Sequence, residues 1–148
     1  MAETLGMLCD KLTIVKLKQY HTENNPERML SLNNQSIQLQ EEIDEYISDA
    51  LKGKIPLERI TFASNKVFKK EGNEINEIKG SIGELFSQLA EVNCKLWHEV
   101  EKGYDIENVP IDEKDNIVKM LAILNLERNK CIDEINNSFK NSLIKKNG

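Results

Sequence analysis

The sequence is poor both in residues that interrupt helices and in residues that favour strands. Its 148 residues include only 3 prolines and 7 glycines, and aromatic residues make up 5% of the chain. Strands are enriched in aromatic residues and their turns in Gly and Pro, so this composition disfavours a fold of many short strands. A chain of this length suits one domain that can bury a core without disulfides or metal ions.

Cysteine and histidine are also scarce. The 3 cysteines (Cys9, Cys94 and Cys131) include no Cys-x-x-Cys pair, and the 2 histidines form no HxxxH pattern. An odd number of isolated cysteines is typical of reduced thiols in a cytoplasm and disfavours a disulfide framework or a zinc site. The sequence therefore favours no metal and no cofactor.

Long apolar runs and an excess of positive charge are both missing. No apolar run approaches the roughly 20 residues that a membrane-spanning helix needs, and the opening MAETLGMLCDK lacks the pattern of a signal peptide. With 20 basic and 25 acidic residues the net charge is -5. An acidic surface repels a phosphate backbone, so we expect a cytoplasmic protein without a membrane span and without a nucleic-acid partner.

Four segments carry the apolar spacing of amphipathic helices. Helix-start signals support two of them: Asn25 before Pro26, and the capping box formed by Ser81 and Glu84. The predicted helices cover residues 4–21, 26–51, 81–103 and 112–144, with Asp112 as the N-cap of the last. Residues 52–80 lose the pattern and predict an irregular crossover with one short helix near residues 57–69. The fold class is thus all-α, a four-helix antiparallel bundle in a single domain, residues 1–148.

The sequence also repeats itself. Residues 4–21 align without a gap with residues 81–98, and the matches that helical periodicity does not require are a glycine, a lysine and an aromatic-His pair. These matches are Gly6 with Gly83, Lys18 with Lys95, and Tyr20-His21 with Trp97-His98. They predict a duplicated helical hairpin, with repeat 1 at about 4–51 and repeat 2 at about 81–144. Gly6 and Gly83 would permit close approach of another backbone.

The repeated polar residues are the candidates for ligand binding. A lysine and a histidine stand three residues apart on one helix face in each copy, and in the second copy the carboxylates of Glu91 and Glu84 extend that stripe. Such a face suits a phosphate or sugar pocket; the alternative is a structural role at a helix end. The aromatic rings either cover the core or stack on a ligand, and an arginine beside the last apolar stripe needs Asp10 or Glu91 as partner. The candidates are Lys18, His21, Glu91, Lys95, Trp97, His98 and Arg128.

A second chemistry is suggested by Glu41, Glu42 and Glu45. Carboxylates at this spacing on a helix can hold Mg²⁺, and the pattern resembles the first half of the motif of all-α nucleotide pyrophosphohydrolases related to MazG. The second half, Glu-x-x-Asp, does not occur downstream, where the nearest substitutes are Glu71, Glu74 and Glu77. The alternative is that the trio forms a solvated acidic face.

Three phrases resemble a known bacterial family: LCDKLTIVKLKQYH at residues 8–21, EVNCKLWHEVE at residues 91–101 and LNLERNKCIDEIN at residues 124–136. They are similar to an uncharacterised family, known only as a domain of unknown function, that is often encoded near lipopolysaccharide and other surface-polysaccharide genes. The resemblance implies a helical fold and a link to polysaccharide assembly, and it implies no catalytic residues.

Three functional hypotheses follow. The first is a non-catalytic accessory or ligand-binding protein that takes a small glycan or a nucleotide-type ligand. The second is a Mg²⁺-dependent nucleotide pyrophosphohydrolase. The third is a homo-oligomeric scaffold, which requires an exposed apolar stripe and no pocket.

Overall fold

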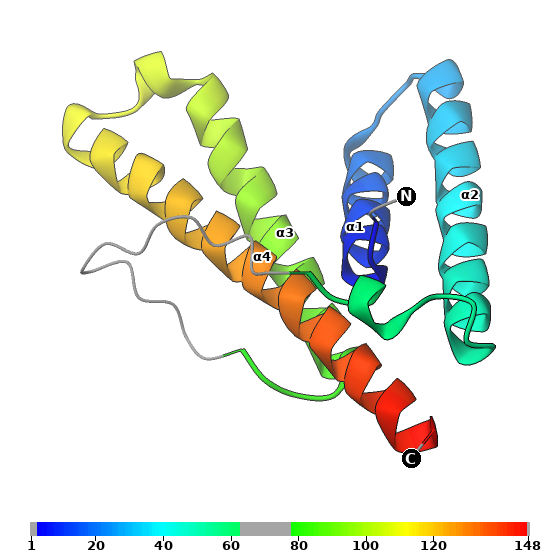
Figure 1. Ribbon diagram of the computed structural model, residues 1–148. Coiled ribbons are helices and arrows are strands. Elements are labelled where there is room, and N and C mark those ends of the chain that lie inside the picture. The colour runs from blue at the N-terminus through cyan, green and yellow to red at the C-terminus, as the bar shows by residue number, and fades with distance from the viewer. Residues whose placement is uncertain (1–2, 63–77, 148) are drawn as a thin grey trace.

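The computed structural model in Figure 1 describes residues 3–62 and 78–147, and the regular secondary structure of these residues is helical, without strands. This confirms the predicted fold class. No helix in this part of the chain is both long enough and apolar enough to cross a bilayer. The four long helices are α1 (Leu5–His21), α2 (Pro26–Leu51), α3 (Ile82–Tyr104) and α4 (Ile111–Asn147), with short 3₁₀ turns η1 (Leu57–Arg59) and η2 (Ile106–Asn108).

Side-chain caps set where three of the helices begin. The Thr4 side chain accepts a hydrogen bond from the backbone N–H of Met7 at the start of α1, and Asn25 caps α2 ahead of Pro26. At α3, both hydrogen bonds of the predicted Ser81–Glu84 capping box are present. These side chains satisfy backbone donors that have no partner within the helix.

The last helix differs from its prediction at both ends. Asp112 is not the N-cap, because α4 already begins at Ile111, directly after Pro110. There Asp112 lies in the first turn, where its negative charge is favourable near the positive end of the helix dipole. At the other end α4 continues to Asn147, beyond the predicted end near Ile144.

The crossover between the two hairpins is irregular where it is described, at residues 52–62 and 78–80. The helix predicted near residues 57–69 is only the 3₁₀ turn η1 over its first residues, and residues 63–69 lie outside the described part of the chain. Ile60 follows this turn and is completely buried. The crossover is therefore anchored to the core by a side chain that the helical pattern did not single out.

The helices pack as two antiparallel hairpins joined through α1. Helix α2 pairs with α1 and α3 pairs with α4, while α1 also packs against both α3 and α4. In Figure 1 the two hairpins spread apart at one end, and α1 and α3 begin at the same end of the molecule. These pairs are those of a four-helix bundle in which α1 is the central element and α2 packs chiefly on α1.

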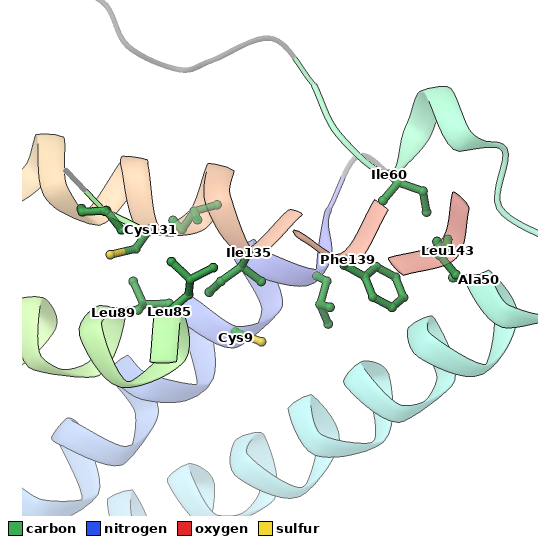
Figure 2. Close-up of a cluster of buried hydrophobic side chains, with 12 residues drawn as sticks. Cys9, Ala50, Ile60, Leu85, Leu89, Cys131, Ile135, Phe139 and Leu143 are labelled. Carbon is green, nitrogen blue, oxygen red and sulfur yellow. The ribbon is translucent and has the colours of Figure 1, made fainter. Parts of the chain in front are cut away.

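The main core lies where the hairpins converge. Apolar side chains from all four long helices meet there, and the C-terminal half of α4 passes through it with Cys131, Ile135, Phe139 and Leu143 in succession (Figure 2). A smaller cluster, Val92, Leu96 and Leu124, holds α3 to α4 further along. Most of the apolar contact between the hairpins thus lies at the end of the molecule where α1 and α3 begin.

An unusually close contact of α1 with α4 occurs at Gly6. Its backbone N–H donates to Asn136 Oδ1 at 2.7 Å, while Asn136 Nδ2 donates to Thr4 Oγ1 at 2.9 Å. A Cβ on Gly6 would lie 2.5 Å from the Ile132 carbonyl oxygen, so only glycine fits. The predicted close approach is confirmed for Gly6. It is wrong for Gly83, which has no such neighbour within 4 Å.

The two repeat-related glycines provide a matched pair of variants. We expect Gly6→Ala to lower the free energy of unfolding by about 1–3 kcal/mol, the typical cost of forcing extra volume into a packed contact. Gly83→Ala should be neutral or stabilising by up to about 1 kcal/mol, because Ala favours the helix and meets no neighbour. Urea denaturation of both variants measures the difference. Equal stabilities would show that α4 does not approach α1 this closely.

Candidate functional site

A buried carboxylate on α1 is the centre of the polar contacts between the hairpins. Asp10 is only 5% exposed and forms a two-pronged ion pair with Arg128 of α4. The Arg128 Nε donates to Asp10 Oδ1 at 2.8 Å, and Nη2 donates to Oδ2 at 2.5 Å. The hydrogen bond with Asp10 is the main reason that the pKa of Arg128 is raised above its usual value. Arg128 therefore pairs with Asp10, one of its two predicted partners.

Asn93 of α3 completes this polar cluster. Its side chain is 1% exposed, and its Nδ2 donates both to Asp10 Oδ1 at 2.9 Å and to Thr13 Oγ1 at 2.7 Å. The Thr13 hydroxyl in turn donates to the Asp10 carbonyl at 2.7 Å. Three helices thus contribute to one hydrogen-bonded unit, and a fixed arrangement of this kind can shape a binding cleft.

The Asp10–Arg128 pair borders a polar cleft of about 460 Å³ between α1, α2 and α4. Its walls combine cations, carboxylates and side-chain amides, so the cleft offers both donors and acceptors of hydrogen bonds. The side chains with these functions are Glu3, Asp10, Lys11, Lys18, Gln35, Gln38, Glu42 and Arg128. We call this the polar cleft. Gln35 and Gln38 were not among the predicted site residues.

A second, smaller cleft of about 270 Å³ lies at the turn between α1 and α2. It is lined by Lys18, His21, Thr22, Glu23, Asn25, Arg28 and Trp97, and we call it the basic cleft. Lys18 lines both clefts, so they adjoin along α1. The lysine at which they meet is one of the predicted ligand-binding residues.

Aromatic rings from both hairpins meet beside the basic cleft. His21 stacks on Trp97 with ring centroids 4.8 Å apart and planes 9° apart, and His98 meets His21 edge-on at 6.2 Å. Tyr20 packs edge-on against His21 from the outside, at 5.2 Å. The two repeat-related histidines are therefore neighbours, which the sequence could not establish.

The remaining predicted residues lie on the exposed side of α3. Lys95 pairs with Glu91 at 3.3 Å, and His98 Nδ1 lies 3.8 Å from Glu101. Glu84, at the start of the same stripe, is engaged in the capping box. Neither Glu91 nor Lys95 lines one of the two clefts. The structure thus brings together Lys18, His21, Trp97 and Arg128, but places Glu91 and Lys95 apart from them.

The acidic trio of the magnesium hypothesis is divided. Glu42 and Glu45 line a third cleft of about 360 Å³ together with Glu3 and Asp49, whereas Glu41 is exposed and does not line it. Within residues 3–62 and 78–147, no three His, Cys, Asp or Glu side chains are arranged to hold a metal ion. Glu71, Glu74 and Glu77 lie outside these residues. Glu42 lines both this cleft and the polar cleft.

The cysteines offer no nucleophile within either cleft. Cys9 and Cys131 are buried, and their burial is the main cause that raises the pKa of each thiol to about 11. Both thiols therefore remain protonated at neutral pH, and the thiolate is the reactive form. Cys94 is exposed, but it lies in a separate apolar groove between α1 and α3 with Lys16, Leu17 and Phe86.

Comparison of the chain with protein-family models, with curated proteins and with solved structures finds no match.

The buried pair can be tested by removing its cation. We expect Arg128→Met to lower the free energy of unfolding by about 3 kcal/mol, because it leaves the Asp10 carboxylate buried without its counter-charge. The matched control is Lys130→Met, which breaks the more exposed pair with Glu134 on the same helix and should cost less than about 1 kcal/mol.

A second substitution separates lost charge pairing from lost packing. Adding Asp10→Asn to Arg128→Met removes the unpaired charge and should restore part of the stability. Urea denaturation measures all three variants beside the unmodified protein. If the double variant is less stable than Arg128→Met, the uncompensated Asp10 charge is not the cause of the loss.

Proposed function

We propose that this protein is a non-catalytic accessory protein that binds a small sugar-type ligand in the polar cleft. The observation that carries this proposal is the composition of the cleft, where paired charges and the side-chain amides of Gln35 and Gln38 surround one space of about 460 Å³. That volume lies in the range of small-molecule sites. A fixed ion pair at its border and polar walls favour a ligand rich in hydroxyl groups.

The charges of the polar cleft support a polar ligand over a strongly charged one. Its three acidic side chains, Glu3, Asp10 and Glu42, are matched by Lys11, Lys18 and Arg128. Two of these cations are already engaged, Arg128 with Asp10 and Lys11 with Glu3. The amides of Gln35 and Gln38 contribute further donors and acceptors, and together such groups can orient the hydroxyls of a sugar.

The sequence resemblance agrees with this choice of ligand. Asp10, Asn93 and Arg128 come from the three phrases that resemble the family encoded near surface-polysaccharide genes, and in this structure they form one hydrogen-bonded cluster. A cluster shared by all three phrases supports a role for the neighbouring cleft. We therefore propose a cytoplasmic role in surface-polysaccharide or nucleotide-sugar metabolism.

Ligand-induced stabilisation tests the proposal directly. A ligand that binds the folded state raises the apparent melting temperature, so monosaccharides, sugar phosphates and nucleotide sugars can be screened by thermal shift. We expect at least one of them to stabilise the protein, and Gln38→Ala to weaken its affinity about fivefold or more, because the variant loses a hydrogen bond to the ligand.

The control is Gln40→Ala on the same helix, because Gln40 does not line the polar cleft. This variant should bind as the unmodified protein does. A screen without any stabilising sugar compound, or equal losses in the two variants, would contradict the proposal.

A Mg²⁺-dependent nucleotide pyrophosphohydrolase is the second candidate, and the position of Glu42 favours it. This carboxylate lines two clefts and shares one of them with Glu3, Glu45 and Asp49. If the protein is such an enzyme, it will release pyrophosphate from nucleoside triphosphates in Mg²⁺, and Glu42→Gln will reduce the rate at least about a hundredfold. Glu41→Gln, outside the cleft, is the control. No release of pyrophosphate at any Mg²⁺ concentration would exclude this candidate.

A homo-oligomeric scaffold is the third candidate, and exposed apolar side chains at the far end of the second hairpin favour it. Tyr104 is 87% exposed and Ile111 is 85% exposed, on either side of η2, and Val118 is exposed further along α4. The polar cleft and the basic cleft, by contrast, are features that a scaffold does not need.

A further inference from the structure

We infer that the basic cleft binds a phosphoryl group, with Lys18 and Arg28 as its cations and the stacked His21–Trp97 pair as its wall. This inference rests on the proposed function in one respect: if a sugar occupies the polar cleft, its phosphate occupies the basic cleft. The ligand class is then a phosphorylated sugar, either a sugar phosphate or a nucleotide sugar.

The connection between α1 and α2 brings the two cations together. Lys18 belongs to the last turn of α1 and Arg28 to the first turn of α2, and the short connection at residues 22–25 places both side chains on the same small cleft. Thr22 and Asn25 line it between them. An anion in this space would therefore be approached from two helices.

The two cations of the basic cleft are not engaged in ion pairs within the described part of the chain. Among the described residues, neither Lys18 nor Arg28 forms an ion pair, whereas Lys11, Lys95, Lys102, Lys130 and Arg128 each pair with a carboxylate. Glu23 is the one acidic residue that lines the basic cleft. Two cations against a single lining carboxylate make this cleft locally positive in a protein whose net charge is -5.

The residue types suit phosphate in particular. The guanidinium of an arginine can bind two phosphate oxygens at once, and a lysine supplies a compact positive charge beside them. The ring of His21 is held in place by its stack on Trp97, so a ring nitrogen can donate to a further oxygen without first being ordered. The contact with Trp97 also brings the second hairpin to the wall of the site.

Lys18 connects this subsite to the proposed sugar site. Because it lines both clefts, a phosphoryl group beside Lys18 leaves the rest of the same ligand within reach of the polar cleft. The polar cleft holds two amides and the Lys11–Glu3 and Asp10–Arg128 ion pairs, while the basic cleft adds Arg28 beside the shared Lys18. A molecule with a hydroxylated ring at one end and a phosphate at the other matches this division.

The position of Trp97, the single tryptophan of the chain, allows a direct test. Inorganic pyrophosphate is titrated into the unmodified protein at constant ionic strength while the tryptophan fluorescence is followed. We expect a saturable change in fluorescence, because the anion binds beside the His21–Trp97 stack. Sodium chloride at matched ionic strength should produce none.

Two pairs of variants assign the effect to the cleft. Lys18→Gln and Arg28→Gln should each weaken pyrophosphate binding about tenfold or more, the usual size of a lost charge-assisted contact. Lys16→Gln on α1 and Arg59→Gln in η1 remove the same charges outside the basic cleft, and they should leave the affinity unchanged. No saturable change, or equal losses in control and site variants, would overturn the inference.

The outcome for this subsite and the outcome for the proposed function can be separated. If a neutral sugar stabilises the protein but Arg28→Gln leaves the affinity for its phosphate ester unchanged, the phosphate subsite is wrong and the sugar site stands. If pyrophosphate binds through Lys18 and Arg28 but no sugar compound stabilises the protein, the subsite is supported and the proposed sugar ligand is wrong.

Discussion

The burial of the Asp10 carboxylate on α1 is the constraint around which the helices are arranged. Moving a carboxylate out of water costs several kcal/mol unless a partner with good geometry compensates for it. Here the compensation comes from Arg128 of α4 and from Asn93 of α3, both within hydrogen-bonding distance. A slide of either helix along α1 by one turn would break these bonds. The apolar core favours association of the helices, and the polar cluster fixes the positions at which they associate.

The sequence predicted the helices well because local signals determine their ends. The Asn25–Pro26 start and the Ser81–Glu84 capping box depend on residues within four positions of each other, and both formed as predicted. The start of α4 was misjudged because Asp112 is equally suited to the N-cap and to the first turn. The start of a helix depends on residues close in sequence, which is why it can be predicted from a short stretch of the chain.

The candidate site was predicted only in part, because periodicity shows which residues share a helix face but not which helix that face meets. Lys18, His21, Trp97 and Arg128 lie at the clefts, while Lys95 turns outward to pair with Glu91. Asn93 and Asn136 were missed as structural residues, although each lies beside an apolar stripe. A buried asparagine among aliphatic neighbours needs partners from another helix, and this was the signal that could have revealed both.

The clefts arise because the second helices of the two hairpins, α2 and α4, pack differently on the rest of the molecule. At the start of α1, Gly6 allows the backbone of α4 to approach closely, and its N–H donates a hydrogen bond to Asn136 Oδ1. The matching Gly83 of α3 has open space around it. Helix α4 therefore packs on both α1 and α3, but α2 packs chiefly on α1.

A fully symmetrical packing would place α2 against α3 in the same way. Instead, α2 stands beside α1 with its amides and carboxylates facing the side of α1 that carries Asp10, Lys11 and Lys18. The departure from symmetry that Gly6 and Asn136 stabilise is therefore also what leaves the polar cleft between the helices. If the hairpins did arise by duplication, the divergence between the copies at these contacts is what separates a fully packed bundle from one with a polar cleft.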